Sequence, residues 1–195
     1  MIAIVDTGGA NIASVSNALE RLKLESKLTS DRKEIENATH VILPGVGQAR
    51  TSMTKLKDNG LIECIKGLKQ PVMGICLGMQ ILFEGSEEGD IACLGILPGV
   101  VKRLTSSPVH PIPHMGWNQV EFSGTSALTD GVPGNSFFYF VHSFKAPKSE
   151  FTTGVCDYSE TFPAMVQRDN FFGVQFHPER SAAAGARLLK NFVSL

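Results

Sequence analysis

Residues 71–80 read Pro-Val-Met-Gly-Ile-Cys-Leu-Gly-Met-Gln, and this stretch predicts a strand, a sharp turn and a helix in direct succession. The apolar run at its start predicts a strand, and the residues from Leu77 to Phe83 predict a helix that follows at once. A glycine lies two places on either side of Cys76, which permits the sharp strand-to-helix turn of a nucleophile elbow. Such a turn exposes the thiol, and the N–H groups at the helix start favour the thiolate, which attacks carbonyls. The stretch therefore predicts a reactive cysteine.

A base for this thiol is required, because a lone cysteine is more often a small buried apolar residue than a nucleophile. The chain offers His177. The run Phe171 to Phe176 predicts a strand that ends at this histidine, and the carboxyl ends of parallel strands meet in one crevice. We expect His177 to face Cys76 there, with Glu179 orienting the imidazole across the intervening proline.

Strand and helix patterns alternate through the first half of the chain. Strands are expected at residues 2–5, 25–28, 40–43 and 72–75, and helices around 12–22 and 31–38. This order predicts an α/β fold, a mostly parallel twisted sheet flanked by helices, with functional loops at the carboxyl ends of the strands. Further short runs at 100–104, 117–122, 137–141 and 171–176 predict antiparallel additions in the C-terminal half.

The bulk composition indicates a single domain over residues 1–195, because no shift in composition divides the chain. The formal net charge is −1 and the 18 Lys and Arg residues are scattered, which argues against the basic stripe of a nucleic-acid-binding protein. There is no basic leader before Asp6, and no run approaches the roughly 20 apolar residues of a membrane span. We therefore expect a cytoplasmic protein that binds neither nucleic acid nor membrane.

The other cysteines and two histidines are expected to be structural. Cys64, Cys93 and Cys156 form no Cys-x-x-Cys pair, which argues against a disulfide framework and against a zinc site, so no metal is expected. His114 and His142 lack an accompanying carboxylate pattern and are expected to be satisfied within the fold.

The loop Pro44-Gly45-Val46-Gly47 follows a predicted strand, and its two glycines allow peptide orientations that other residues resist. An acyl-transfer site needs donors for the oxyanion, and the Leu77 N–H supplies only one. The loop could present the second, although a plain strand-to-helix turn is the alternative.

Several motifs together carry a resemblance to a known family. The sequence resembles the class I, triad-type glutamine amidotransferases, and in particular the branch that forms the glutaminase subunit of imidazole glycerol phosphate synthase in histidine biosynthesis. The resemblance spans nearly the whole chain and implies a flavodoxin-like fold in three layers. Its motifs are Asp6 to Asn11, Pro44 to Gly47, Gly74 to Gln80, Pro113 to Asn118, Phe140 to Ser143 and His177 to Ser181.

The resemblance implies that Cys76 attacks the side-chain amide of glutamine to give a glutamyl thioester and ammonia, with His177 moving protons and Glu179 orienting it. Water then releases glutamate, and no cofactor is involved. The family binds glutamine at the positions of Gly47, Gln80, Ser143 and Phe144, and its oxyanion hole corresponds to Val46, Gly47 and Leu77, with the Val46 N–H reached after a peptide flip. Phe144 stands where many relatives carry tyrosine.

The resemblance also implies a partner, a (β/α)8-barrel cyclase subunit in a heterodimer. That partner uses ammonia to form imidazole glycerol phosphate and an aminoimidazole carboxamide ribonucleotide. Asn11 and Trp117 match interface positions, while Arg180 is either an interface ion-pair residue or a solvated charge. Free ammonia becomes ammonium in neutral water and loses its nucleophilic lone pair, which favours transfer within a complex.

Three alternatives remain open from the sequence. The chain could serve a different synthase, it could be a stand-alone thiol amidohydrolase, or it could be a non-catalytic binding subunit. The segment from His114 to Asn118 argues against the first two, and the presence of nucleophile, base and oxyanion glycines argues against the third.

Overall fold

An eight-stranded sheet forms the centre of the computed structural model, which describes residues 1–8, 12–45, 47–124 and 126–195. Its order is β2-β1-β3-β4-β14-β13-β12-β9. The first five of these strands are parallel, and the last three continue antiparallel. The strands are β1 (Ile2–Val5), β2 (Ser26–Thr29), β3 (His40–Leu43), β4 (Val72–Ile75), β9 (Glu121–Phe122), β12 (Thr152–Asp157), β13 (Thr161–Arg168) and β14 (Phe171–Val174).

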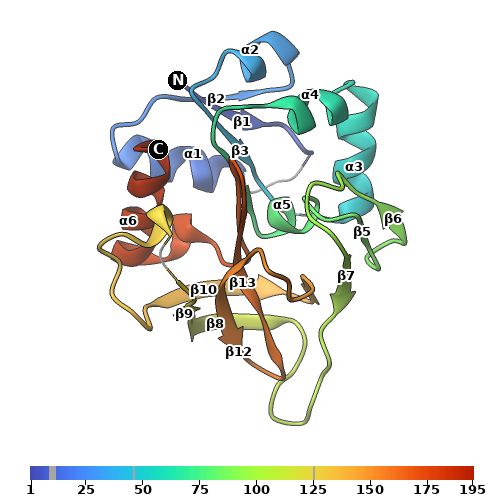
Figure 1. Cartoon of the computed structure of the whole chain (residues 1–195), viewed down its shortest axis with the longest axis vertical. Coiled ribbons are helices and arrows are strands. Elements are labelled where there is room, and N and C mark those ends of the chain that lie inside the picture. The colour runs from blue at the N-terminus through green and yellow to red at the C-terminus, as the bar shows by residue number, and fades with distance from the viewer. Residues whose placement is uncertain (9–11, 46, 125) are drawn as a thin grey trace.

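Helices cover both faces of the parallel part, as the alternation of buried side chains requires (Figure 1). Ile4 of β1 belongs to one core with Leu19 of α1 and Leu188 of α6, whereas the next residue, Val5, belongs to a second core with Leu56 of α3. The predicted three-layer α/β fold is therefore confirmed. The helices are α1 (Ile12–Arg21), α2 (Arg32–Glu36), α3 (Ala49–Asp58), α4 (Ile62–Gly67), α5 (Leu77–Gln80) and α6 (Ala182–Val193), with 3-10 turns η1 (Ala127–Thr129) and η2 (Pro178–Arg180).

The sequence pattern predicts that the strands of the C-terminal half add antiparallel to the main sheet, but they are divided among three sheets. β8 (His114–Gln119) pairs only with β10 (Phe137–His142) in a separate two-stranded sheet. A small third sheet has the order β11-β7-β5-β6, formed by β5 (Gly85–Ser86), β6 (Ile91–Ala92), β7 (Val100–Arg103) and β11 (Phe144–Lys145). The run at 171–176 gives β14, which lies parallel to β4 in the middle of the main sheet. Apolar alternation marks a strand but carries no information on its partner, which explains the difference.

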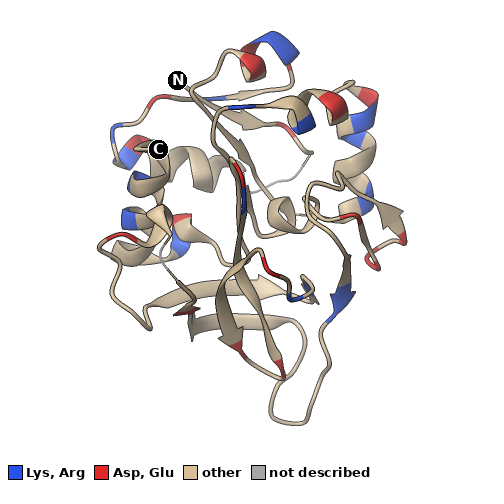
Figure 2. Ribbon diagram, viewed as in Figure 1, with Lys and Arg blue, Asp and Glu red and all other residues tan. Residues whose placement is uncertain are grey.

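Strands β8 and β10, at one end of the molecule, carry no Lys, Arg, Asp or Glu. Figure 2 shows Lys, Arg, Asp and Glu gathered mainly on the helices at the other end of the molecule. The sequence contains no such residue from Leu104 to Val120 or from Gly131 to Phe144. In the part of the chain that the structure describes, no helix is long and apolar enough to cross a membrane.

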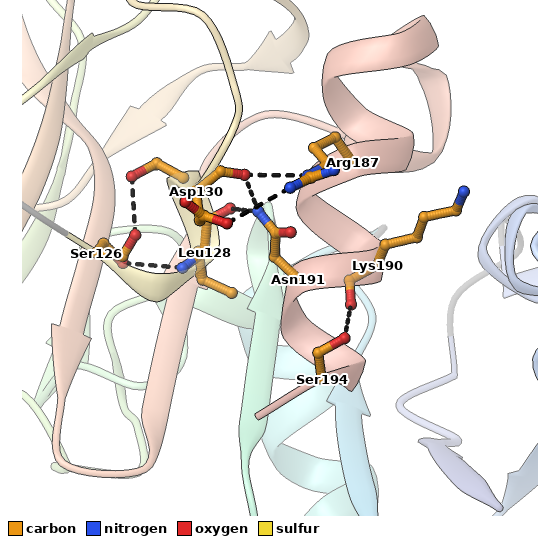
Figure 3. Close-up of polar contacts among 8 residues, drawn as sticks. Ser126, Leu128, Asp130, Arg187, Lys190, Asn191 and Ser194 are labelled. Atoms are coloured by element: carbon orange, nitrogen blue, oxygen red, sulfur yellow. Dashed lines mark hydrogen bonds and ion pairs between the residues drawn. The ribbon is translucent and has the colours of Figure 1, made fainter.

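The segment between β9 and β10 is fixed to α6 by polar contacts (Figure 3). Asn191 Nδ2 donates to Leu128 O at 2.9 Å and to Asp130 O at 2.7 Å. Arg187 Nε donates to the same Asp130 carbonyl at 3.1 Å. These bonds satisfy backbone carbonyls at the end of η1, and they hold that turn against α6.

Candidate active site

Cys76 occupies the turn between β4 and α5 with a backbone φ of +52°, a conformation that non-glycine residues rarely adopt. Its N–H donates to Val174 O at 2.7 Å, and its carbonyl accepts from Met79 N at 3.1 Å and Gln80 N at 3.2 Å. The neighbouring strand and the first turn of α5 thus hold the strained residue in place. Helix α5 ends at Gln80, three residues earlier than the sequence pattern predicts.

Glycines allow the elbow to press against the adjoining backbone. A Cβ atom at Gly78 would lie 1.9 Å from Leu43 O at the end of β3, and one at Gly45 would lie 2.2 Å from Gly78 N. Both distances are far inside ordinary van der Waals contact. A Cβ atom at Gly74 would likewise lie 2.4 Å from Gly78 O, so both glycines of the Gly-x-Cys-x-Gly pattern are required by packing as well as by the turn.

His177 and Glu179 form a buried pair beside this elbow. His177 Nδ1 lies 2.8 Å from Glu179 Oε1, and the two side chains are 4% and 1% exposed. Because a carboxylate accepts, Nδ1 carries the hydrogen and Nε2 is the atom available as a base. Burial opposes protonation of the ring, but its interactions with Cys76 and Glu179 outweigh burial and raise the pKa of His177 to about 10. This favours the protonated form of the His177 ring at neutral pH.

The sheet brings the thiol and the imidazole to the same edge. β14 lies parallel to β4 with Val174 opposite Ile75, so both strands end side by side. Cys76 and His177 follow these ends and line one cavity of about 350 Å³. The cavity is also lined by Gly45, Gly47, Leu77, Gln80, Glu88, Pro113, Val141, His142, Ser143, Phe144 and Arg180.

The Pro44 loop lies against the elbow at the mouth of this cavity. Thr7 Oγ1 donates to Pro44 O at 3.2 Å, which holds the start of the loop. Gly47 is exposed, lines the cavity and has a φ of +107°, a conformation open to glycine at little cost. Val46, the predicted second oxyanion donor, lies outside the described residues, whereas Leu77 of the elbow lines the cavity.

The residues predicted to bind glutamine lie on the cavity wall. Gln80 Nε2 donates to Phe144 O and to Gln175 Oε1, both at 2.9 Å, which leaves Gln80 Oε1 as the amide atom that could accept a hydrogen from a ligand. Ser143 and Phe144 line the same wall through the segment that leads into β11. The Gln80 contact is to the Phe144 main chain, so it does not depend on a tyrosine hydroxyl at that position.

Comparison with known proteins then decides the family. The sequence model of the family described as glutamine amidotransferase class-I matches residues 3–195. The chain belongs to this family. Solved structures of the family share the fold: one titled "Crystal structure of glutamine amidotransferase" gives a TM-score of 0.76 at 19% identity and covers 99% of this chain and 97% of its own. "Structure of PurLQS from Thermotoga maritima" gives 0.72 at 18% identity, covering 99% and 97%.

Full-length relatives of this amidotransferase are much more similar in sequence. "Imidazole glycerol phosphate synthase subunit HisH 2" of Legionella pneumophila (strain Paris) is 51% identical over 195 residues, 100% of this chain and 98% of the relative. "Imidazole glycerol phosphate synthase subunit HisH" of Xylella fastidiosa (strain Temecula1 / ATCC 700964) is 50% identical over 194 residues, covering 100% and 97%. The protein of that name from Xanthomonas axonopodis pv. citri (strain 306) is 49% identical over the same coverage.

Two of the predicted interface residues of this amidotransferase, Trp117 and Arg180, contact the same ring, that of Tyr139. Trp117 of β8 is 52% exposed and meets the Tyr139 ring edge-on at 6.2 Å. The Arg180 guanidinium lies over the same Tyr139 ring, 5.8 Å from its centroid. Arg180 also lines the cavity. Arg180 therefore connects the cavity rim with the β8–β10 surface. Asn11 lies outside the described residues.

Three residues near the amidotransferase site were not singled out by the sequence patterns. Glu88 lines the cavity, and its Oε2 accepts from Ala49 N at 2.9 Å at the start of α3. Tyr139 links Trp117 to Arg180. Gln175 contacts Cys76 Sγ through Nε2 at 3.6 Å, and its separation of two residues from His177 on an extended segment is a signal that could have found it.

The remaining histidines and cysteines named above are buried or bonded within the fold. His114 Nδ1 and His142 Nε2 are 3.0 Å apart, and burial lowers the pKa of His114 to about 4 and that of His142 to about 3. All four cysteines are free. Burial raises the pKa of Cys93 to about 11 and of Cys156 to about 12, so neither is a nucleophile at neutral pH.

Proposed function

We propose that this amidotransferase is the glutaminase subunit of imidazole glycerol phosphate synthase, which acts in histidine biosynthesis. The observation that carries the proposal is a thiol on a positive-φ elbow, in one cavity with a histidine whose Nδ1 is held by a buried carboxylate. Relatives at about half identity over the full length carry that name. Cys76, His177 and Glu179 are its catalytic residues.

The reaction begins with the Cys76 proton already held on His177 Nε2, and the sulfur attacks the side-chain amide carbon of glutamine. The carbonyl oxygen becomes negative, and N–H groups of Leu77 and of the loop at Val46 and Gly47 stabilise it. The C–N bond then breaks, His177 returns its proton to the departing nitrogen, and ammonia leaves a γ-glutamyl thioester. Water attacks the thioester with His177 as base, the C–S bond breaks, and glutamate leaves.

The cavity offers groups suited to the two ends of glutamine. Glu88, which lines the cavity, provides a carboxylate for the α-ammonium group. Main-chain groups at Ser143 and Phe144 serve the α-carboxylate, and Gln80 Oε1 accepts from the substrate. No cofactor or metal takes part in this scheme, because the thiol, the imidazole and the peptide N–H groups supply every proton and charge that it uses.

The partner is a (β/α)8-barrel cyclase subunit in a heterodimer, and the β8–β10 surface supports this. Met115 is 62% exposed, Trp117 52% and Phe137 52%, on two strands that carry no Lys, Arg, Asp or Glu. Aromatic and methionine side chains are typical anchors of protein interfaces, whereas nucleic acid requires basic patches. Asn11 and Arg180 complete the interface, beside which ammonia passes to the cyclase, and the complex works in the cytoplasm.

The loop at Val46 gates the reaction in this proposal. Its flanking glycines permit a peptide flip, and a ligand on the cyclase that binds one loop state more tightly shifts the loop toward that state. Unchanged glutamine turnover when the cyclase nucleotide is added to an assembled complex would contradict the gating.

The experiment that tests the function measures glutamate release by the purified chain alone and with a cyclase partner carrying its nucleotide. A large rise on mixing that is absent in Cys76→Ala supports the glutaminase subunit. Equal turnover with and without the partner favours a stand-alone amidohydrolase. Turnover that rises only with the cyclase of another pathway would assign the chain to a different synthase.

A further inference from the structure

Gln175 contacts the nucleophile from the protein side, away from the cavity. Its side chain is fully buried, and its Nε2 lies 3.6 Å from Cys76 Sγ, within the range of an N–H···S hydrogen bond. It belongs neither to the His177–Glu179 pair nor to the cavity lining. The fully buried Gln175 amide therefore contacts the reactive sulfur, and the proposed reaction assigns it no role.

The neighbouring residues fix which end of this amide faces the sulfur. The Phe144 carbonyl can only accept, so the Gln80 amide must turn its NH₂ group toward it. The second hydrogen of Gln80 Nε2 then points at Gln175, which must offer its Oε1 as acceptor at 2.9 Å. The NH₂ group of Gln175 is thereby left facing Cys76 Sγ. The orientation follows from a main-chain carbonyl, which settles the O and N assignment of both amides.

We propose that Gln175 is a catalytic residue that donates a hydrogen bond to Cys76 Sγ, holds the sulfur toward the cavity and stabilises its anionic form, with Gln80 orienting the donor. The proposal deepens the proposed function and rests on Cys76 being its nucleophile. A hydrogen bond to an anion is about twice as strong as one to a neutral group, so the donor favours the thiolate over the thiol. The neutral thiol, in contrast, can donate to Val141 O, which lies 3.8 Å from the sulfur.

The competing explanation is that Gln175 only fills space and satisfies Gln80. An apolar side chain of similar length would then serve nearly as well for the sulfur. The two explanations differ in one observable, the pH dependence of Cys76 reactivity, because a space-filling residue leaves that dependence unchanged. Cys76 and His177 titrate as a coupled pair, so the midpoint of the pH profile is an apparent pKa of the pair and not of either residue alone.

The test measures the alkylation rate of Cys76 by iodoacetamide against pH in the isolated chain, with Cys76→Ala as the baseline for the other three cysteines. Gln175→Met removes the donor with little change in length. We expect the midpoint of the profile to rise by about 1 pH unit, which makes alkylation roughly tenfold slower below the midpoint. Gln167→Met, at a glutamine of β13 bonded to Ser126, is the matched control and should leave the midpoint unchanged.

Gln175→Glu keeps an acceptor for Gln80 but replaces the donor with a carboxyl group, and it should raise the midpoint further. This second variant keeps the test decisive if Gln175→Met does not fold, as judged by its thermal unfolding. A folded variant whose midpoint equals that of the unmodified chain overturns the proposal. Alkylation uses neither glutamine nor the cyclase, so a failure of the glutaminase assignment would leave this result standing, and the reverse also holds.

Discussion

Replacing Gly78 with alanine should disrupt the elbow, although the added group is a single methyl. The new Cβ would lie 1.9 Å from Leu43 O and 2.8 Å from Leu43 C, both main-chain atoms of β3. Ordinary contact begins near 3.4 Å, so α5 and β3 must separate by about 1.5 Å. Neither can move freely, because β3 is paired on both sides in the central sheet.

The cost follows from this overlap. Overpacking a core by one methyl typically costs about 1–3 kcal/mol when side chains can give, and a main-chain neighbour gives less. We therefore expect a loss of about 3 kcal/mol in the free energy of unfolding, which for a chain of this length lowers Tm by roughly 6–12 °C. A shift of α5 would also move the Leu77 N–H and Cys76 Sγ relative to His177, so glutamine hydrolysis should fall by at least about tenfold.

Gly67→Ala supplies the matched control. Gly67 is the last residue of α4, and nothing lies within 4 Å of its Cβ position. Alanine favours a helix over glycine by up to about 1 kcal/mol, so this variant should unfold at the same or a slightly higher temperature and keep its activity. The assays are urea unfolding and glutamate release in the complex. If Gly78→Ala behaved like Gly67→Ala in both, the packing argument for the elbow would be refuted.

Three further changes test other parts of the molecule. Glu179→Gln should lower kcat for glutamine about 10²- to 10⁴-fold with little change in KM, because His177 loses its orienting charge, as steady-state glutamate assays can show. Trp117→Ala should weaken binding to the cyclase by about 2 kcal/mol, roughly 30-fold in Kd by titration calorimetry, while the isolated chain unfolds as before. Burial lowers the pKa of His114 to about 4 and of His142 to about 3, so only the unfolded chain takes up these protons as pH falls below the ordinary value of 6.5. Each histidine should therefore lower the free energy of unfolding by about 2 kcal/mol at pH 5 relative to pH 7.5. In urea titrations, His142→Asn should remove about half of this joint loss. A loss that the variant leaves unchanged would show that the His142 ring titrates normally.

The sequence predicted that Cys76, His177 and Glu179 would lie together because each part of this candidate site has a local cause. The elbow needs glycine on both sides of Cys76, and the spacing of two between His177 and Glu179 lets one carboxylate reach the imidazole. The parallel pairing of the central strands followed from the alternation of strands and helices along the chain. These constraints act over a few residues or through one general packing rule, so a single chain displays them.

The rest depends on contacts between distant segments. Nothing in the β8 and β10 runs indicates that they pair with each other rather than with the main sheet. Glu88 reaches the cavity from a segment with no motif, and Tyr139 is linked to the cavity through Arg180, whose guanidinium lies over its ring. Gln175 gave a weak local signal, its separation of two from His177, but its partner Gln80 lies 95 residues away.

One carbonyl joins the catalytic side of the molecule to the β8–β10 surface. Phe144 O accepts from Gln80 Nε2 at 2.9 Å and also from His142 Nδ1 at 2.8 Å. Since Nδ1 of His142 carries the hydrogen, its Nε2 must accept from His114 Nδ1, and His114 Nε2 then accepts from Asn118 Nδ2 at 3.3 Å. Each ring N–H in this row has an acceptor, and the far end of the row is Asn118, the residue next to Trp117.

Such a fully bonded row resists partial displacement, because a buried polar group without a partner costs about 1–3 kcal/mol. The surface proposed to meet the cyclase and the wall proposed to hold glutamine are therefore parts of one packed unit. A shift of β8 on binding must be absorbed along the row or passed to the Phe144 segment.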